Sequence, residues 1–547
     1  MENFQNFKSS YKEKKAQNDL EEEIILNKLS IRKKKLYEIL LQKRLNFTSQ
    51  NSERDGNSQL KEVSILIHKE TFDDIQKGLH ILYEFLINVN KLEKPHIKYI
   101  YENIYYRLLD IINSEKIFDD KGNMSKIFFL INYLTTENNI FIEPITENIF
   151  LSNLKKIIEL NIDKELFINM IIPVLSDMLI NKKKFSQIMK EIDIVKLMKI
   201  KIGQNSTNKE SIEQLLILMN NFIINIKENK THKYQFILEY SLKLIKSDIN
   251  NFFNDEDKSL FLLSLFDILI YMANDSENMK LIKESNCLVF IKNVINDYKN
   301  NKIVNNYIYL LKCEELLSNI LLGTQNFEDK KNIIFFIYSS DILNKNIKEA
   351  NNLPFINEFI YSISNKNYHL SNAFLNCIIS LINNCVEFAE LYINDNNFIN
   401  GLIKLFSEKI PKKMKNSIIL FLIKIVECNN IKIYKYLLNF DIIPILVNYL
   451  NLKKKPKKEP TKIIIYNILL FIKKCLSIEE ENNMNDISNI LIKYNYKEII
   501  ETLIDNKDES ISDVSRKIFI NYLSESEKEY IPKIDVNKKE KEDMIID

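Results

Sequence analysis

Residues 427–450 read ECNNIKIYKYLLNFDIIPILVNYL, and this stretch decides the fold. A short apolar segment ends in polar residues, and a second one follows at once. In the second segment the apolar residues Ile443, Leu446, Val447 and Leu450 recur at the spacing of one helical face. Residues 383–406 (NNCVEFAELYINDNNFINGLIKLF) and 271–295 (YMANDSENMKLIKESNCLVFIKNVI) repeat the pattern. The sequence therefore predicts a recurring unit of helices separated by clusters of Asn, Asp and Ser.

This unit returns along most of the chain. A marker residue near the end of the helix before each break recurs at steps of roughly 40–50 residues, with one longer step. The usual step matches the length of armadillo or HEAT repeats. The residues that mark the steps are Asn132, Asp177, Asn221, Ile270, Asn319, Asn383 and Lys424. Such units cannot close a core alone, and they stack into a superhelix with a concave groove. We therefore expect an all-α armadillo-repeat solenoid, wound as a right-handed superhelix.

The composition supports a helical fold. The 547 residues include 6 glycines and 9 prolines, far below the usual fractions of about 7% and about 5%. Tight β-turns and nucleotide-binding loops need residues with positive φ, so this scarcity argues against β-sandwiches, barrels and Gly-rich phosphate sites. A hydrophobic content of 46% is enough to bury a core.

Residues that could carry chemistry are scattered. The 5 histidines form no His-Glu-x-x-His motif and no cluster with cysteine. The cysteines lie far apart in apolar stretches, as expected of reduced core residues in an intracellular protein; they are Cys287, Cys313, Cys377, Cys385, Cys428 and Cys475. The chain begins without a secretory signal, and no apolar run reaches about 18 residues. We expect a soluble protein of the cytoplasm and nucleus, with no enzymatic activity, metal or cofactor.

The charges nearly cancel, except at the N-terminus. A net charge of +2 does not favour a nucleic-acid-binding domain. Residues 31–47 (IRKKKLYEILLQKRLNF) nevertheless hold six basic residues and one acid. Such a helix could be a nucleic-acid arm, a membrane-surface helix, a targeting peptide or a docking helix. The acids in DLEEEII just before it disfavour a transit peptide, and Glu38 and Gln42 interrupt an apolar face, so a docking helix fits best.

These observations predict four parts of the chain. We expect a basic helical segment over residues 1–47 and a flexible linker over 48–60. Armadillo repeats should follow over 61–524, and a charged disordered tail over 525–547.

Both ends of the sequence resemble one family. QNFKSS, IRKKK and LLQKRLN, in this order, resemble the importin-β-binding segment of the importin α family. The stretches GLHILYEFLINVNK and MSKIFFLINYLTTENN are similar to its first repeats, and YNYKEIIETLIDNKDESISDVSRKIFINYL is similar to its last. The resemblance implies that importin β binds Lys8, Arg32, Lys33, Lys34, Lys35, Lys43 and Arg44.

The resemblance also implies a cargo groove. Importin α binds basic signals through W-x-x-x-N motifs on successive third helices, where Asn amides bond the peptide backbone and Trp faces hold Lys and Arg. The corresponding groove residues here are Phe128, Asn132, Asn221, Phe266, Glu315, Asn319 and Asn383. Phe128 and Phe266 have a second interpretation as core residues, which is the commoner role of such a phenylalanine.

The motif positions depart from the family pattern. The chain has no Trp, Pro173 lies in the second motif helix with Asp177 in the Asn position, and Lys424 replaces the Asn of the seventh. A basic signal should therefore bind weakly.

Two functions remain open. The first is a divergent importin-α-like import adaptor that binds importin β through its N-terminal helix, a cargo segment through the groove, and an export carrier through its last repeat. The alternative is an armadillo-repeat scaffold for protein interactions without nuclear-import activity.

Overall fold

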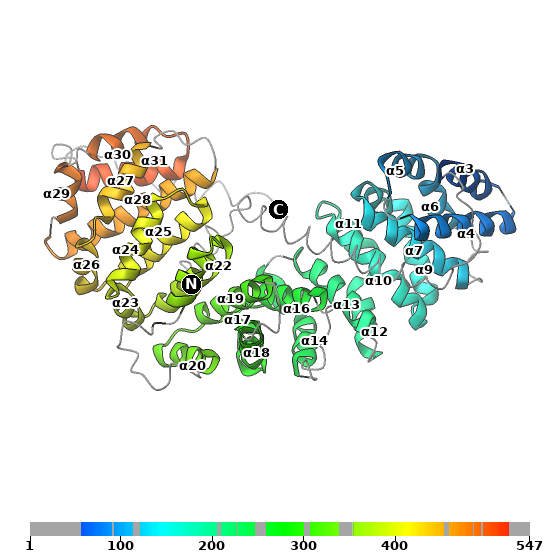
Figure 1. The fold of residues 1–547 in the computed structure, drawn as a ribbon, viewed down its shortest axis with the longest axis horizontal. Coiled ribbons are helices and arrows are strands. Elements are labelled where there is room, and N and C mark those ends of the chain that lie inside the picture. The colour runs from blue at the N-terminus through cyan, green and yellow to red at the C-terminus, as the bar shows by residue number, and fades with distance from the viewer. Residues whose placement is uncertain are drawn as a thin grey trace, which may run out of the picture. The chain divides into compact units, whose positions relative to one another are not determined.

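The chain folds into helices (Figure 1). The structure is a computed structural model, and no strand occurs among the residues that it describes. These are residues 56–69, 71–89, 92–112, 121–204, 209–226, 228–246, 259–299, 307–338, 353, 355–452, 459–484, 486–493 and 496–523. The predicted importin-β-binding residues and the predicted C-terminal tail lie outside these ranges.

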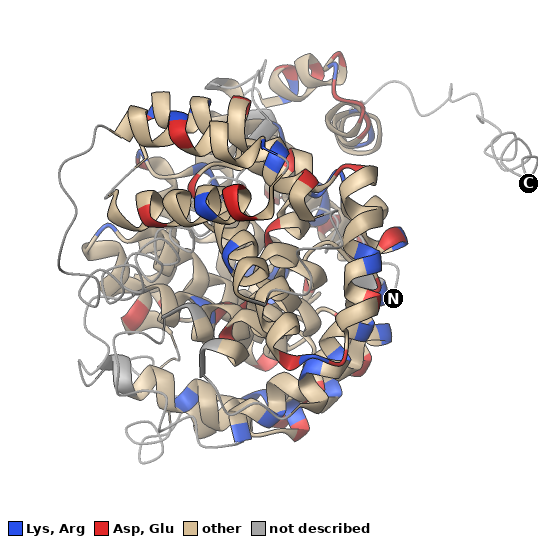
Figure 2. Cartoon of the chain, turned by 90° about the vertical axis from the view of Figure 1, so that its right-hand side faces the viewer, with Lys and Arg blue, Asp and Glu red and all other residues tan. Residues whose placement is uncertain are grey.

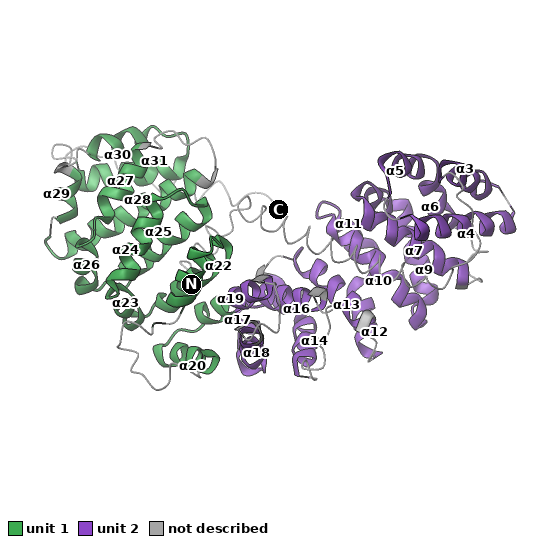
Figure 3. Cartoon of the chain, viewed as in Figure 1, with its two compact units in different colours: residues 1–17, 317–547 green, residues 18–316 purple. Residues whose placement is uncertain are grey.

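The described helices form two compact units, called here the N-terminal unit and the C-terminal unit (Figure 3). The division falls within α19, after Leu316. The N-terminal unit contains α3 (Gly56–Ile67), α4 (Phe72–Asn88), α5 (Lys94–Ile100), the π-helical turn Tyr101–Tyr105, α6 (Tyr106–Ile112), α7 (Lys121–Glu137), the 3₁₀ turn Asn139–Phe141, α8 (Ile142–Ile145), α9 (Asn148–Asn161), α10 (Glu165–Ile180), α11 (Phe185–Glu191), α12 (Ile194–Gly203), α13 (Lys209–Ile223), the 3₁₀ turn Glu228–Tyr234, α14 (Gln235–Lys246), α16 (Ser259–Met272), α17 (Ser276–Glu284), α18 (Cys287–Lys299) and the first part of α19 (Tyr307–Leu322).

The C-terminal unit continues from Leu317. It contains the end of α19, then α20 (Phe327–Tyr338), α21 (Ile356–Ser364), α22 (Tyr368–Ile382), α23 (Val386–Ile393), α24 (Asn396–Ser407), α25 (Lys412–Glu427), α26 (Ile431–Leu438), α27 (Ile442–Leu452), α28 (Glu459–Glu481), α29 (Asp486–Lys493), α30 (Tyr496–Ile504), α31 (Glu509–Ile518) and the π-helical turn Phe519–Leu523.

The repeating element is a set of three helices, as in α23–α24–α25 and α26–α27–α28. Polar residues begin these helices: Asn430 accepts hydrogen bonds from the backbone N–H groups of Lys432 (2.9 Å) and Ile433 (3.4 Å) at the start of α26. Asparagine also supplies left-handed turns after helices, with φ of 55° at Asn384 and 52° at Asn429. In a chain so poor in glycine, Asn takes the role that Gly has at many helix ends.

The third helix of each set packs against the third helix of the next set within a unit. In the N-terminal unit α7, α10, α13 and α16 follow one another in this way, and in the C-terminal unit α22, α25, α28 and α31 do. Their apolar faces are filled by Leu, Ile, Phe and Val, and each fully buried side chain of this kind contributes about 1.5–3 kcal/mol. Basic residues (Lys and Arg) and acidic residues (Asp and Glu) are interspersed along the helices (Figure 2).

The structure corrects one boundary expected from the sequence. Helix α3 begins at Gly56, so the last five residues of the predicted linker 48–60 are helical. Helix α10 runs through Pro173 without ending. The predicted helical breaks at residues 272–278 and around 394–395 are confirmed, because Asp275 and Asp395 cap α17 and α24 there.

Candidate protein-binding surface on the third helices

The third helices carry most of the residues that the sequence selects. We call α7, α10, α13, α16 and α19 up to Leu316 the N-terminal row, and α22, α25 and α28 the C-terminal row. Each row presents polar side chains at a similar level of successive helices. Their contacts decide which of them are available to a partner.

Polar bonds join neighbouring helices of the N-terminal row. Thr135 of α7 donates from Oγ1 to Oδ2 of Asp177 on α10 over 2.7 Å. Asn221 of α13 donates from Nδ2 to the backbone oxygen and the hydroxyl of Ser176, both at 2.9 Å. These pairs lie 42 and 45 residues apart in sequence, which is one repeat. The predicted groove amide of Asn221 therefore holds two repeats together.

A buried charged group continues this row at α16 and α19. Nζ of Lys312 lies 3.1 Å from Oδ1 of Asp267 and 3.0 Å from Oε2 of Glu315, and only 9% of the lysine side chain is exposed. Asn220 of α13 adds a 3.4 Å hydrogen bond to Asp267. Burial disfavours the charged lysine, but the two carboxylates outweigh it and raise the pKa of Lys312. Glu315 is thus bonded to a lysine of its own helix.

The two predicted groove phenylalanines lie in the core, which corrects their assignment. Phe128 is 1% exposed and packs edge-on against Phe167, with ring centroids 5.9 Å apart. Phe266 is 0% exposed and stacks on Phe290 at 4.9 Å. Neither ring can receive a side chain of a partner, because each is buried against an aromatic ring of the next repeat.

A different aromatic occupies the accessible side of α7. Phe129 is half-buried and lies 5.1 Å from Tyr83 and 6.4 Å from Tyr133, between ring centroids. Asn132 follows it at i+3 on the same helix face. The sequence alone pairs Phe128 with Asn132 by the family spacing, and the neighbouring Phe129 is missed for that reason.

The other predicted amides have distinct surroundings. Asn132 is half-buried, and its Oδ1 is buried without a hydrogen-bond partner among the described residues. Asn319 is half-buried on α19. Asn383 follows the last residue of α22 and is 7% exposed, and its backbone oxygen accepts a 2.7 Å hydrogen bond from Lys330. The four predicted amides therefore do not form one uniform set.

The C-terminal row contains an amide series that the sequence analysis missed. Ser417 of α25 donates to Oδ1 of Asn372 on α22 over 2.7 Å, and more weakly to Asn376 at 3.4 Å. Asn467 of α28 donates to Oδ1 of Asn416 on α25 over 2.7 Å. These partners lie 45 and 51 residues apart. A search for Asn recurring at the repeat length could have found them.

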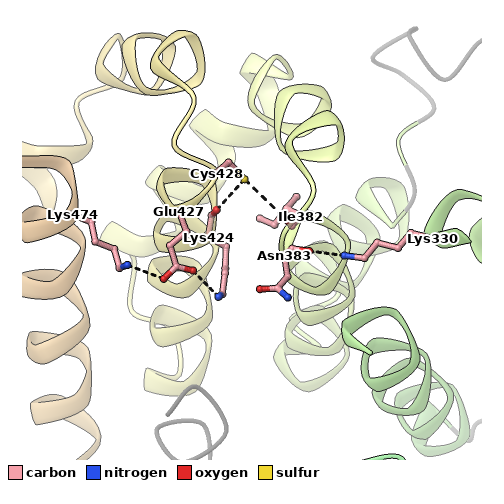
Figure 4. A network of polar contacts seen from close by, with 7 residues as sticks. All are labelled: Lys330, Ile382, Asn383, Lys424, Glu427, Cys428 and Lys474. Atoms are coloured by element: carbon pink, nitrogen blue, oxygen red, sulfur yellow. Dashed lines mark hydrogen bonds and ion pairs between the residues drawn. The ribbon is translucent and has the colours of Figure 1, made fainter. Parts of the chain in front are cut away.

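Charged residues cross the same row near the ends of the helices (Figure 4). Glu427 of α25 accepts ion pairs from Lys424 at 2.6 Å and from Lys474 of α28 at 2.9 Å. Partial burial favours the neutral acid, but the two lysines outweigh it and lower the pKa of Glu427. Asn383 directly after α22, Lys424 and Glu427 of α25, and Lys474 of α28 thus lie in one series (Figure 4).

The described ranges hold no assembled metal site. These ranges contain no group of three His, Cys, Asp or Glu residues that could hold a metal ion. Burial raises the pKa of the Cys287 thiol to about 12 and that of Cys428 to about 11, so both stay protonated near neutral pH. None of the described helices is both long and apolar enough to span a membrane.

Comparisons with known proteins agree with the architecture. No protein-family model matches the sequence, and no curated protein does. An engineered protein of known structure matches with a TM-score of 0.53 and 12% identity, over 85% of this chain and 99% of that chain. A structure solved to study the interaction between cadherin and beta-catenin matches with a TM-score of 0.53 and 9% identity, over 85% of this chain and 86% of that chain. The chain is therefore an all-α solenoid of the armadillo type.

Proposed function

We propose that this protein is an interaction scaffold that holds an extended segment of a partner protein along its third helices, without catalysing a reaction. The supporting observation is that half-buried polar side chains recur on the third helices of each row, such as Gln214 on α13 in the N-terminal row and Asn416 on α25 in the C-terminal row. An amide both donates and accepts hydrogen bonds, as a peptide backbone does.

Helix spacing suits an extended ligand. Packed helices lie about 8–10 Å apart, and an extended chain advances about 3.3 Å per residue. Successive third helices would therefore meet a bound segment at roughly every third residue. Binding of this kind selects a conformation and a side-chain pattern, and it needs no preformed pocket.

Site-specific cross-linking tests this proposal. A photoreactive phenylalanine is placed at Gln214 or Asn416 in the full chain, and the adducts formed in cell extract are mapped by mass spectrometry. Matched controls carry the same group at Lys280 on α17 and at Lys432 on α26, exposed positions outside the rows. We expect one partner to be cross-linked from the third helices and not from the controls. Equal adducts from all four positions would contradict the proposal.

A second candidate is a nuclear import adaptor. The order of QNFKSS, IRKKK and LLQKRLN at the N-terminus supports it, as does the order of importin-α-like stretches along the chain. Importin β would bind the N-terminal segment, the third helices would hold a cargo segment, and an export carrier would bind the last repeat. The protein would then move between cytoplasm and nucleus. The absence of Trp disfavours a conventional basic cargo.

Capture of importin β separates the two candidates. The full chain, a variant lacking residues 1–50 and the double variant Lys33→Glu/Arg44→Glu are compared as bait. Lys14→Glu/Lys15→Glu makes the same charge change outside the family-like motifs. The import candidate predicts capture by the full chain and by this control only. If the full chain captures no importin β, the transport function is excluded and the scaffold proposal stands.

A further inference from the structure

Residues 181–204, which follow α10 and include all of α11 and α12, are strongly basic. They contain seven lysines and two acids, Glu191 and Asp193. This short stretch therefore carries a net charge of +5, whereas the whole chain carries +2. The lysines are Lys182, Lys183, Lys184, Lys190, Lys196, Lys199 and Lys201.

The neighbouring elements do not cancel this charge. Helix α11 contacts α9, and Nζ of Lys199 on α12 lies 5.1 Å from the ring centroid of Phe236 on α14 (Figure 1). Counted in full, α9 has two lysines and one acid, and residues 228–246, which include α14, have four lysines and two acids. From the start of α9 to the end of α14, residues 148–246 contain 16 lysines and 10 acids. The excess therefore survives a complete count of the surroundings.

Most of these lysines are available to a partner. Five of them are exposed, and none of the five makes an ion pair or a side-chain hydrogen bond with a described residue. These five are Lys182, Lys183, Lys190, Lys196 and Lys199. Lys201 differs, because its side chain is 1% exposed and its Nζ lies 3.4 Å from Oε1 of Glu165.

The two acids of the stretch are placed less favourably for a ligand. Glu191 is half-buried at the end of α11. Asp193 begins α12, and its Oδ1 accepts a 2.9 Å hydrogen bond from the backbone N–H of Lys196. The exposed charge of α11 and α12 is therefore mainly that of ammonium groups.

On α12 the lysines are flanked by aliphatic side chains. Lys196, Lys199 and Gly203 recur at i, i+3 and i+7, so they share one helix face. All three are exposed, and the half-buried Val195 and Ile202 lie beside them. A Cβ added at Gly203 would meet nothing within 4 Å, so this face is open. No aromatic side chain is exposed among residues 181–204.

We propose that α11 and α12 bind the surface of a membrane that contains anionic lipids, a role beyond the scaffold function proposed above. The long lysine side chains reach the lipid phosphates, and Val195 and Ile202 face the interfacial region beside them. Each lysine near such a surface strengthens binding about fivefold. The third helices of the same repeats remain free to hold a protein segment.

A membrane fits this surface better than a nucleic acid or an acidic peptide. Single-stranded nucleic acids stack their bases on aromatic side chains, which are not exposed here. A peptide backbone needs amide or hydroxyl partners, but the exposed side chains of α12 are lysines alone. Lysine is a point charge without the planar fork of arginine, so it recognises charge density rather than a fixed ligand geometry.

Vesicle binding by the full chain tests the inference. The chain is sedimented with vesicles of phosphatidylcholine, with and without phosphatidylserine, at low and at physiological salt. We expect it to bind the vesicles with phosphatidylserine, less strongly as salt rises, and to bind those of phosphatidylcholine alone little. A single-stranded oligonucleotide and a Glu/Ser/Gly peptide are titrated in parallel.

Three variants locate the binding. Lys196→Gln/Lys199→Gln removes two charges from the exposed face of α12, and Lys432→Gln/Lys435→Gln makes the same change at exposed positions of α26. The first should weaken vesicle binding about tenfold to thirtyfold and the second about twofold or less. Gly203→Lys adds a cation where space is open and should strengthen binding about threefold to fivefold. Unchanged circular dichroism and melting temperature confirm that the variants fold.

Several outcomes overturn the inference. They are no binding to vesicles with phosphatidylserine, equal losses in the two double variants, and tighter binding of the oligonucleotide or the peptide. A variant lacking residues 1–50 tests the basic N-terminal segment. If this variant loses vesicle binding while Lys196→Gln/Lys199→Gln retains it, the N-terminal segment binds the membrane and α12 does not. Cross-linking from Gln214 and Asn416 tests the scaffold proposal separately, so the two proposals can fail independently.

Discussion

Replacement of the buried Lys330 should loosen the C-terminal unit far more than replacement of its neighbour. Lys330 is 0% exposed on α20. Its Nζ donates to the backbone oxygens of Ser380 at 2.7 Å, Leu381 at 2.9 Å and Asn383 at 2.7 Å, where α22 ends. The ammonium group therefore satisfies carbonyls that have no partner within their own helix, at the negative end of its dipole.

The magnitude follows from these contacts. Hydrogen bonds to a charged group contribute about 1.5–3 kcal/mol each, so three amount to about 4.5–9 kcal/mol. Burying the ammonium costs several kcal/mol, roughly 3–5. We therefore expect Lys330→Met to lower the local stability of α20 and of the end of α22 by about 2–4 kcal/mol, after the lost hydrogen bonds and the avoided desolvation are combined.

Hydrogen exchange measures this change segment by segment. Because each 1.4 kcal/mol is a factor of ten, amides of α20 should exchange about 30-fold to 1,000-fold faster in Lys330→Met. Lys331→Met is the matched control: this lysine is 30% exposed and pairs with Glu328 at 3.2 Å. Its exchange should change about twofold or less. Equal acceleration in the two variants would refute the reasoning.

Three further predictions concern other groups. Lys312→Met should weaken the packing of α16 on α19 by about 3–5 kcal/mol, because Asp267 loses its buried partner. Amides of α16 should then exchange hydrogen faster, and an unchanged exchange rate would contradict the ion pair's role. The lysines beside Glu427 hold its pKa below the ordinary value of 4.5, so its ion pairs stabilise the fold above pH 4.5 and are lost as the pH falls through the lower pKa of the folded state. Glu427→Gln should therefore flatten this part of the acid-unfolding curve relative to the unmodified chain. Identical curves would exclude the effect. Burial raises the pKa of both the Cys287 and the Cys428 thiol, but Cys428 is less buried and its pKa is raised less. In the native protein at pH 8, Cys287 should therefore resist iodoacetamide and Cys428 should react first. Mass spectrometry checks this order, and rapid labelling of Cys287 would contradict it.

The sequence predicts the repeats well, because their signals are local. Asp275, Asp395 and Asn430 stand where helices begin, and their side chains cap those helices as the polar clusters predict. Apolar periodicity likewise identifies the faces of the third helices. Pro173, a departure from the family motif, lies inside α10, and the helix continues through it because its surroundings bury α10 and keep it helical.

The candidate surface was harder to predict, because its contacts join residues one repeat apart. Nothing near Asn221 in sequence shows that its amide bonds Ser176, which lies 45 residues away. Phe128 and Phe129 are adjacent aromatics, and only the packing of Phe167 decides which one is buried.

Lysine footprinting tests the central claim most directly. The full chain is labelled briefly with an amine-reactive acetylating reagent, with and without the partner protein that is cross-linked from Asn416, and acetylation is measured at each lysine. The account predicts protection of Lys413, Lys424, Lys473 and Lys474, with unchanged labelling of Lys432 and Lys435 on α26. Protection of the α26 lysines instead, or equal protection at both places, would contradict a binding surface on the third helices.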